Sequence, residues 1–83
     1  GGLKMPYIEG TRKADILSGD VPRTVGELVF EITMVVLNFL PAKPRFADYD
    51  TVIGALECAK LELYRRRVAV YEDQKIRENG DVY

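Results

Sequence analysis

Histidine and tryptophan are missing from this sequence of 83 residues, and cysteine occurs once, at Cys58. Without histidine the chain has no Ser-His or Cys-His nucleophile pair, lacks the commonest general base, and cannot build most zinc and iron sites. One cysteine allows neither an internal disulfide nor a cysteine-based zinc site. We therefore expect no metal and no cofactor, favour a role other than catalysis, and expect Cys58 to be a buried, unreactive thiol.

Long apolar runs and a marked net charge are missing too. No apolar run approaches the roughly 20 residues that cross a bilayer. Residues 1–10 lack the basic start and the apolar stretch of a secretory signal. The formal net charge of −1 gives no general attraction to nucleic acid or to an anionic membrane. We expect a cytoplasmic protein that does not bind membranes and for which nucleic acid is a poor candidate partner.

What is present indicates a folded helical chain. Hydrophobic residues make up 47% and charged residues 30% of the sequence, a composition typical of globular proteins. We predict a single helical domain over residues 1–83, with an extended arm at 1–10 and a tail at 81–83. Between them, a short helix is expected from Arg12 to Ser18, with Thr11 as its N-cap and Gly19 as its left-handed stop.

The first long helix is predicted at about residues 24–40. Thr24 and Glu27 have the spacing of a capping box, in which each side chain accepts from the other residue's backbone amide. Glu27, Glu31 and Asn38 form one narrow polar stripe, and nearly all other positions are apolar. A helix that is apolar on most of its circumference has to be buried on most of its circumference.

The second long helix is predicted at about residues 49–79. Asp48 or Asp50 is expected to cap it, and Gly80 to end it. Two ion pairs in the favourable i, i+4 order, Glu62 with Arg66 and Asp73 with Arg77, indicate a side that faces solvent. Its predicted apolar face consists of Val52, Leu56, Ala59, Leu63 and Val70.

These elements predict an all-α fold: a helical hairpin of two long helices, about 24–40 and 49–79, plus a short N-terminal helix. When two helices pack only against each other, each leaves about half of its surface exposed to water. We therefore predict a homodimer or a higher oligomer, with two hairpins forming a four-helix bundle. The alternative is a compact monomer whose N-terminal arm covers the first helix. Gly54 belongs to a group of small residues where another helix can approach closely. The predicted oligomer interface comprises Val29, Ile32, Val36, Phe39 and Gly54.

Arginine and tyrosine side chains offer one candidate ligand site. Forked hydrogen bonds from Arg65 and Arg66, with stacking on Tyr64 and Tyr71, suit a phosphate or a nucleotide. Three consecutive arginines spread over roughly 200° of a helix, so only a subunit interface gathers them. The competing interpretation is a solvated face whose arginines pair with Glu62.

Glutamates offer a second candidate chemistry. All-α nucleotide pyrophosphohydrolases bind magnesium through a Glu-Glu-x-x-Glu motif on one helix and Glu-x-x-Asp on the next. This sequence has neither motif within a helix. We therefore favour a capping role for Glu27, and solvated or lightly paired roles for Glu31, Glu57 and Glu62.

Residues 11–83 also resemble a family of small proteins of unknown function encoded in phage and bacterial genomes. The most distinctive part is C-terminal. The resemblance rests on Gly26-Glu27-Leu28, on Val52 to Cys58, on Glu62 to Arg66, on Tyr71-Glu72-Asp73 with Lys75, and on Glu78-Asn79-Gly80-Asp81-Val82-Tyr83. It implies a phage-type or mobile-element origin and brings no activity or ligand with it. The leading hypothesis is a homo-oligomeric interaction module that binds itself and a host or viral protein. A phosphate-binding oligomer and a magnesium-dependent hydrolase rank second and third.

Overall fold

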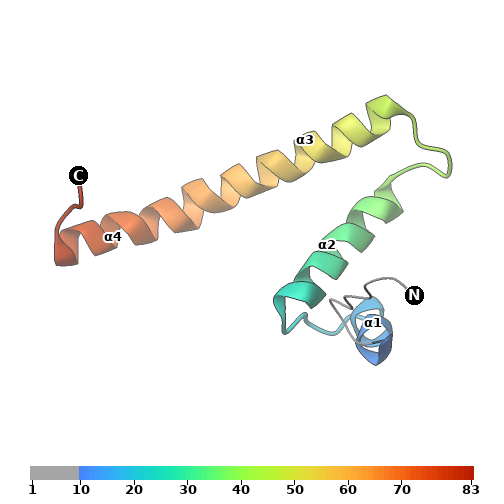
Figure 1. The fold of residues 1–83 in the computed structure, drawn as a ribbon, viewed down its shortest axis with the longest axis horizontal. Helices are drawn as coiled ribbons and strands as arrows, with labels where there is room; N and C mark the ends of the chain where they lie inside the picture. The colour runs from blue at the N-terminus through green and yellow to red at the C-terminus, as the bar shows by residue number, and fades with distance from the viewer. Residues whose placement is uncertain (1–9) are drawn as a thin grey trace, which may run out of the picture. The chain divides into compact units, whose positions relative to one another are not determined.

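Residues 10–83 are described by a computed structural model of the chain (Figure 1). They are helical, without a strand in this part of the chain, which confirms the predicted all-α class. The chain divides into two units, residues 1–43 and residues 44–83. Most of the predicted N-terminal arm lies outside the described residues. The helical elements are α1 (Gly10–Leu17), α2 (Val25–Phe39), α3 (Phe46–Leu63), the π-helical turn η1 (Tyr64–Val68) and α4 (Ala69–Asn79).

Helix α1 begins at Gly10, so Thr11 lies inside the helix and is not its N-cap as predicted. Its C-terminal end follows the prediction, because Gly19 adopts a φ of +107°, which side chains with a Cβ rarely tolerate. The amide of Asp20 donates to the carbonyl of Asp15 at 3.0 Å, and the amide of Gly19 donates to Ile16 at 3.0 Å. These two bonds form a Schellman motif, which turns the chain back towards α2.

Helix α2 begins at the predicted capping residue, but only half of the capping box forms. Thr24 is extended, with φ −125° and ψ 163°, and its hydroxyl accepts from the amide of Glu27. The Glu27 carboxylate accepts from the amide of Arg23 at 3.1 Å, one residue before the predicted donor. The helix ends at Phe39, because Leu40 precedes Pro41 and is held in an extended conformation.

Helix α3 begins three residues earlier than predicted. Its N-cap is Arg45, which is extended, with φ −98° and ψ 171°. Asp48 lies three residues further on, and its carboxylate accepts from the Arg45 amide at 2.8 Å. Asp48 therefore acts from within the first turn and is not itself the N-cap. An acidic side chain in the first turn also interacts favourably with the positive end of the helix dipole, which stabilises the helix.

Helices α3, η1 and α4 form one continuous helix from Phe46 to Asn79 (Figure 1). At a rise of about 1.5 Å per residue, this helix is roughly 50 Å long. It ends where predicted, at Gly80, whose φ is +84°. The interruption at η1 was not predicted: there the amide of Ala69 donates to the carbonyl of Tyr64, five residues back.

The π turn corrects the predicted apolar face of the second long helix. A π turn takes about one residue more than an α turn, so later side chains are rotated back by roughly 100°. Val70 therefore leaves the face that Val52, Leu56 and Leu63 share, and Tyr71 takes its place. The predicted face was derived from an uninterrupted period of 3.6 residues per turn, and this period holds only up to η1.

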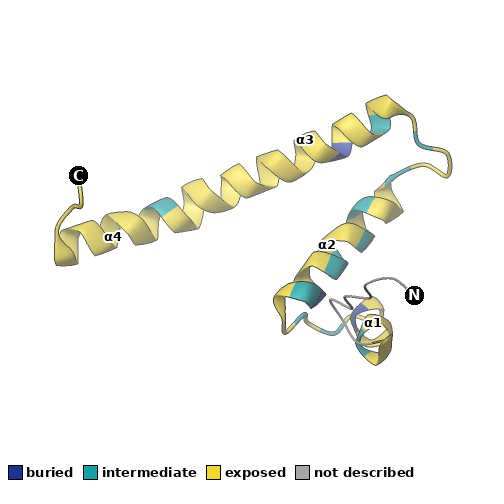
Figure 2. Ribbon diagram, in the orientation of Figure 1, coloured by how far each residue is buried: buried dark blue, intermediate teal, exposed yellow. Residues whose placement is uncertain are grey.

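Few apolar side chains within residues 10–83 are buried. The buried hydrophobic residues are Ile16 in α1, at 5% exposure, and Val52 in α3, at 6%. Figure 2 shows most of α3 and most of α4 as exposed. No helix in the described part of the chain combines the length and the apolar character that crossing a bilayer requires.

Candidate functional site

The best-defined polar cluster joins α1 to α2 through the guanidinium of Arg12. Arg12 donates to Glu27 Oε1 from Nε at 3.0 Å and from Nη2 at 2.6 Å. Its Nη1 donates to Asp20 Oδ2 at 2.7 Å, and Nη2 also reaches the carbonyl of Val21 at 3.1 Å. The Glu27 side chain is only 9% exposed and that of Arg12 17%. Charge-assisted bonds of this kind are among the strong ones, so the cluster ties α1 to α2.

The same contacts shift the acid–base equilibria of the cluster. The hydrogen bond from Arg12 is the main cause that lowers the pKa of Glu27 below its ordinary value of 4.5, although burial opposes the shift. The pKa of Asp20 is also lowered, again chiefly by the hydrogen bond from Arg12. The two carboxylates in turn raise the pKa of Arg12. All three groups are therefore charged at neutral pH.

Acidification is expected to release α1 from α2. A carboxylate whose pKa is lowered by folding stabilises the fold fully above its unfolded pKa, and this contribution is lost as the pH falls through the lowered value. Since the ordinary pKa of glutamate is 4.5, helicity in α1 should hold at neutral pH and fall below about pH 4. Chemical shifts of Ile16 and Glu27, followed by NMR from pH 7 down to pH 2, would show the transition.

Backbone signals of α3 serve as the internal control for that titration, because α3 contributes no residue to this cluster. Loss of α1 structure already near neutral pH would contradict the role of the Arg12, Glu27 and Asp20 cluster in holding α1 on α2. So would an unchanged α1 at pH 2.

From the sequence, Glu27 was predicted to cap α2, whereas the roles of Arg12 and Asp20 were not predicted. A signal was present, because only seven residues, 18–24, separate α1 from α2. A connection this short returns the chain beside its starting point. A basic residue in α1 then lies near the acidic first turn of α2.

Helix α2 has one side turned towards α1. Glu27 is buried on this side, and Phe30 and Met34 are half-buried. These positions are three and four residues apart, so they share one stripe of the helix. Helices α1 and α2 pack against each other within the first unit. This side of α2 is therefore occupied.

The opposite side of α2 carries no charged residue and is largely exposed. Its members alternate at spacings of four and three residues, the pattern of a helix–helix seam. Exposure is 78% at Val25, 49% at Val29, 43% at Ile32 and 71% at Phe39. Val36, in the middle of the stripe, is half-buried. We call these five residues the open face of α2.

Four of the five predicted interface residues, all except Gly54, belong to this open face. Gly54 lies within α3, where a Cβ added to it would meet no atom within 4 Å. Within residues 10–83, therefore, no contact requires glycine at this position. The interface itself remains a prediction.

The candidate phosphate ligands lie on η1 and α4 and make separate contacts. Arg66 Nε donates to Glu62 at 2.6 Å, and Arg65 Nη2 reaches both oxygens of the same carboxylate at 3.1 and 3.2 Å. These contacts lower the pKa of Glu62, with Arg66 the main cause. The Tyr64 hydroxyl donates to Glu72 at 2.5 Å, which raises the pKa of Tyr64. The arginines thus pair as the solvated-face interpretation predicts.

Tyr71 contacts a different cation. The Lys75 ammonium lies 5.6 Å from the centre of the Tyr71 ring, within the range of a cation–π interaction. The predicted pair of Asp73 with Arg77 is not among the ion pairs formed within residues 10–83. The single chain therefore does not gather Tyr64, Arg65, Arg66 and Tyr71 around one point.

The prediction for Cys58 is wrong for the single chain, where the thiol is exposed on α3. Its apolar and small neighbours predicted burial, but within the second unit, residues 44–83, the Cys58 side chain is left exposed. Across residues 10–83, no three Cys, Asp or Glu side chains lie close enough together to hold a metal ion.

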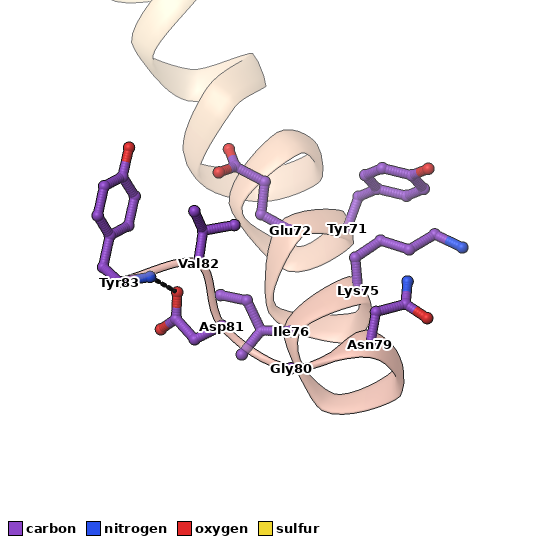
Figure 3. A pocket seen from close by; sticks show the side chains of 9 residues that line it. All are labelled: Tyr71, Glu72, Lys75, Ile76, Asn79, Gly80, Asp81, Val82 and Tyr83. Atoms are coloured by element: carbon purple, nitrogen blue, oxygen red, sulfur yellow. Dashed lines mark hydrogen bonds between the residues drawn. The ribbon is translucent and has the colours of Figure 1, made fainter.

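A groove of about 490 Å³ lies beside α4, where the tail turns back after Gly80 (Figure 3). Glu72 and Ile76 line it from the helix, and Val82 lines it from the tail. The amide of Tyr83 donates to the Asp81 carboxylate at 3.1 Å, which shapes the tail locally. The sequence predicted the helix stop at Gly80 but not this groove.

These features define a small all-helical protein with an ion-paired helix junction and an open apolar helix face. Residues 5–82 match the family described as Domain of unknown function (DUF6899), and the chain belongs to this family. No curated protein and no solved structure matches it significantly.

Proposed function

We propose that this chain is a protein-interaction module that works as a homo-oligomer, with two helical hairpins packed as a four-helix bundle. The observation that carries the proposal is the open face of α2, which exposes Val25, Val29, Ile32 and Phe39 by 43–78%. Folded monomers rarely leave contiguous apolar patches of this kind in water. The other side of α2 is already taken by α1.

The small core of the single chain supports the same proposal. Ile16 and Val52 are the buried hydrophobic residues within residues 10–83. Fixing the backbone of one residue costs roughly 1–2 kcal/mol, so two buried side chains cannot offset the ordering of the helices. Association offsets this cost by burying apolar surface that each chain leaves exposed.

A hairpin is the arrangement of α2 and α3 that we propose within each subunit. The connection from Leu40 to Arg45 is short, and short connections between helices favour antiparallel neighbours. Two such hairpins bring four apolar helix faces together. Most oligomers of identical chains have closed symmetry, and two-fold dimers are the commonest of them. A two-fold dimer is therefore the simplest assembly.

Gly54 provides a test of this arrangement that depends on concentration. Glycine inside a helix is less favourable than alanine by about 0.5–1 kcal/mol. Since a Cβ at this site meets nothing within 4 Å, Gly54→Ala should stabilise the isolated chain. In the assembly the added methyl group would separate closely packed helices and weaken association. Thermal melts at low and high protein concentration would show opposite shifts in Tm.

A stabilising effect of Gly54→Ala at every concentration would remove Gly54 from the proposed interface. Ala55→Ser, a change of similar size beside it on the same helix, is the matched control.

For the origin of the chain we propose a phage-type or mobile-element source and a cytoplasmic location. The support is the resemblance of the C-terminal segment from Tyr71 to Tyr83. The test is the genomic position of the coding sequence: integration and structural genes beside it would support the proposal. A setting among conserved housekeeping genes would overturn it.

Light scattering coupled to size-exclusion chromatography, on a dilution series of the intact chain, tests the proposed oligomer. A dimer or larger species that dissociates on dilution supports the shared core. A monomer at all concentrations would overturn it, and the open face of α2 would then be covered from within the chain. The phosphate-binding and hydrolase alternatives remain predictions without a contact that favours them.

A further inference from the structure

The continuous helix of the second unit carries a second line of residues suited to pairing. Leu61, Arg65, Ala69, Glu72 and Ile76 follow one another at spacings of four, four, three and four residues. Residues three and four apart are neighbours on a helix, so these five lie along one side. Leu61 is 56% exposed, Ile76 is 41% exposed, and Ala69 is half-buried. We call this line the η1 seam.

The order of residue types in the η1 seam is self-complementary. From Leu61 to Ile76, the residue types follow the order apolar, basic, small, acidic and apolar. A second copy laid antiparallel about a point between Val68 and Ala69 places Arg65 opposite Glu72 and Leu61 opposite Ile76. Each contact occurs twice, once on either side of the axis. A parallel copy would instead place Arg65 opposite Arg65.

We propose that the η1 seam is a second contact between copies of this chain, separate from the open face of α2, at which two copies pair antiparallel; it rests on the proposed function as a homo-oligomer. The small side chain of Ala69 at the centre lets the two helix backbones approach closely. The turn at η1 holds Arg65 in line with Ala69, because a spacing of four residues lies close to a full π turn.

Existing contacts of the charged members do not block this pairing. Arg65 is bound to Glu62, three residues away, and both side chains are more than half exposed. Glu72 accepts from the exposed hydroxyl of Tyr64. Exposed contacts between near neighbours contribute little, so a carboxylate from a second copy competes readily for Arg65.

The groove beside α4 provides room at each end of the η1 seam. Ile76 and Glu72 line the groove, with Val82 of the tail on its other side (Figure 3). Its volume of about 490 Å³ is open to an incoming side chain. In the antiparallel arrangement, Leu61 of the second copy enters this groove and covers Ile76.

Charge-reversed variants test the η1 seam. Arg65→Glu or Glu72→Arg alone creates two like-charge contacts per dimer. Each is expected to raise the dissociation constant about tenfold or more at low salt. An equal mixture of the two variants restores both attractive contacts. Native mass spectrometry of the mixture should show heterodimers well above the statistical half.

Arg67→Glu is the matched control, because it reverses a charge in the same turn on the opposite side of the helix. The doubly reversed chain, with Arg65→Glu and Glu72→Arg together, should dimerise like the unchanged protein. This variant also covers the case in which a single reversal fails to fold. The advantage of the mixture should shrink as salt is raised.

Three results would overturn the seam. They are a mixture that pairs at random, a control that weakens association as much as Arg65→Glu, and single reversals that leave the dissociation constant unchanged. In each case a persistent dimer of the unchanged chain would leave the proposed function standing. A monomer at all concentrations would remove both proposals.

Discussion

Val36→Glu should break the contact between copies that the open face of α2 forms. Val36 is half-buried at the centre of the open face of α2, between Ile32 and Phe39. In a symmetric dimer the substitution introduces two carboxylates into an apolar contact. Burying a polar group without a partner costs at least about 1–3 kcal/mol, and a charge costs more. Two such sites predict a dissociation constant raised at least about a hundredfold.

Size-exclusion light scattering and circular dichroism together separate dissociation from unfolding. Asn38→Glu is the control, because it adds the same charge on α2 at an exposed position outside the open face. We expect Asn38→Glu to keep the association of the unchanged chain. A Val36→Glu protein that remains a dimer would mean that the interface lies on another surface.

Arg12→Ala should free α1 from α2. The substitution removes every charge-assisted bond between Arg12 and the carboxylates of Glu27 and Asp20. It also leaves Glu27, a buried residue, without its cation. Breaking one partner of a buried ion pair is strongly destabilising, because the other charge remains in a poor environment. Helicity equivalent to the eight residues of α1 should be lost.

Hydrogen exchange of the α1 amides would follow this loss residue by residue, with α3 as the reference. Arg23→Ala is the matched control, since Arg23 is 72% exposed and lies 3.7 Å from Asp20. Arg12→Lys should restore only part of the protection, because an ammonium lacks the forked geometry of a guanidinium. Full protection in Arg12→Ala would show that apolar contacts alone hold α1.

Local signals in the sequence predicted most of the secondary structure. Thr24 begins α2 and Gly19 ends α1, because caps and left-handed stops act through residues only three or four positions away. Gly80 likewise ends α4 where predicted. The start of α3 was missed because the N-cap, Arg45, has no capping side-chain oxygen. Asp48 supplies the bond from within the helix.

Other features depend on contacts that sequence spacing does not encode. The bond from Arg12 to Glu27 joins residues 15 positions apart, and it required the turn between α1 and α2 to close. The π turn at η1 shifts Val70 off its predicted face, and no single residue marks the change in period. Cys58 is exposed on α3 although its apolar and small neighbours in the sequence predicted burial.

The sequence by itself determined that this protein is helical, where α2 begins, where α1 and α4 end, and that α2 is apolar on most of its circumference. Capping and periodicity are short-range effects, so the residues that cause them are neighbours in the chain. Only the tertiary structure decided which side of α2 is occupied. That choice follows from the ion pair between Arg12 and Glu27, which turns one side towards α1 and leaves Val29, Ile32 and Val36 on the other.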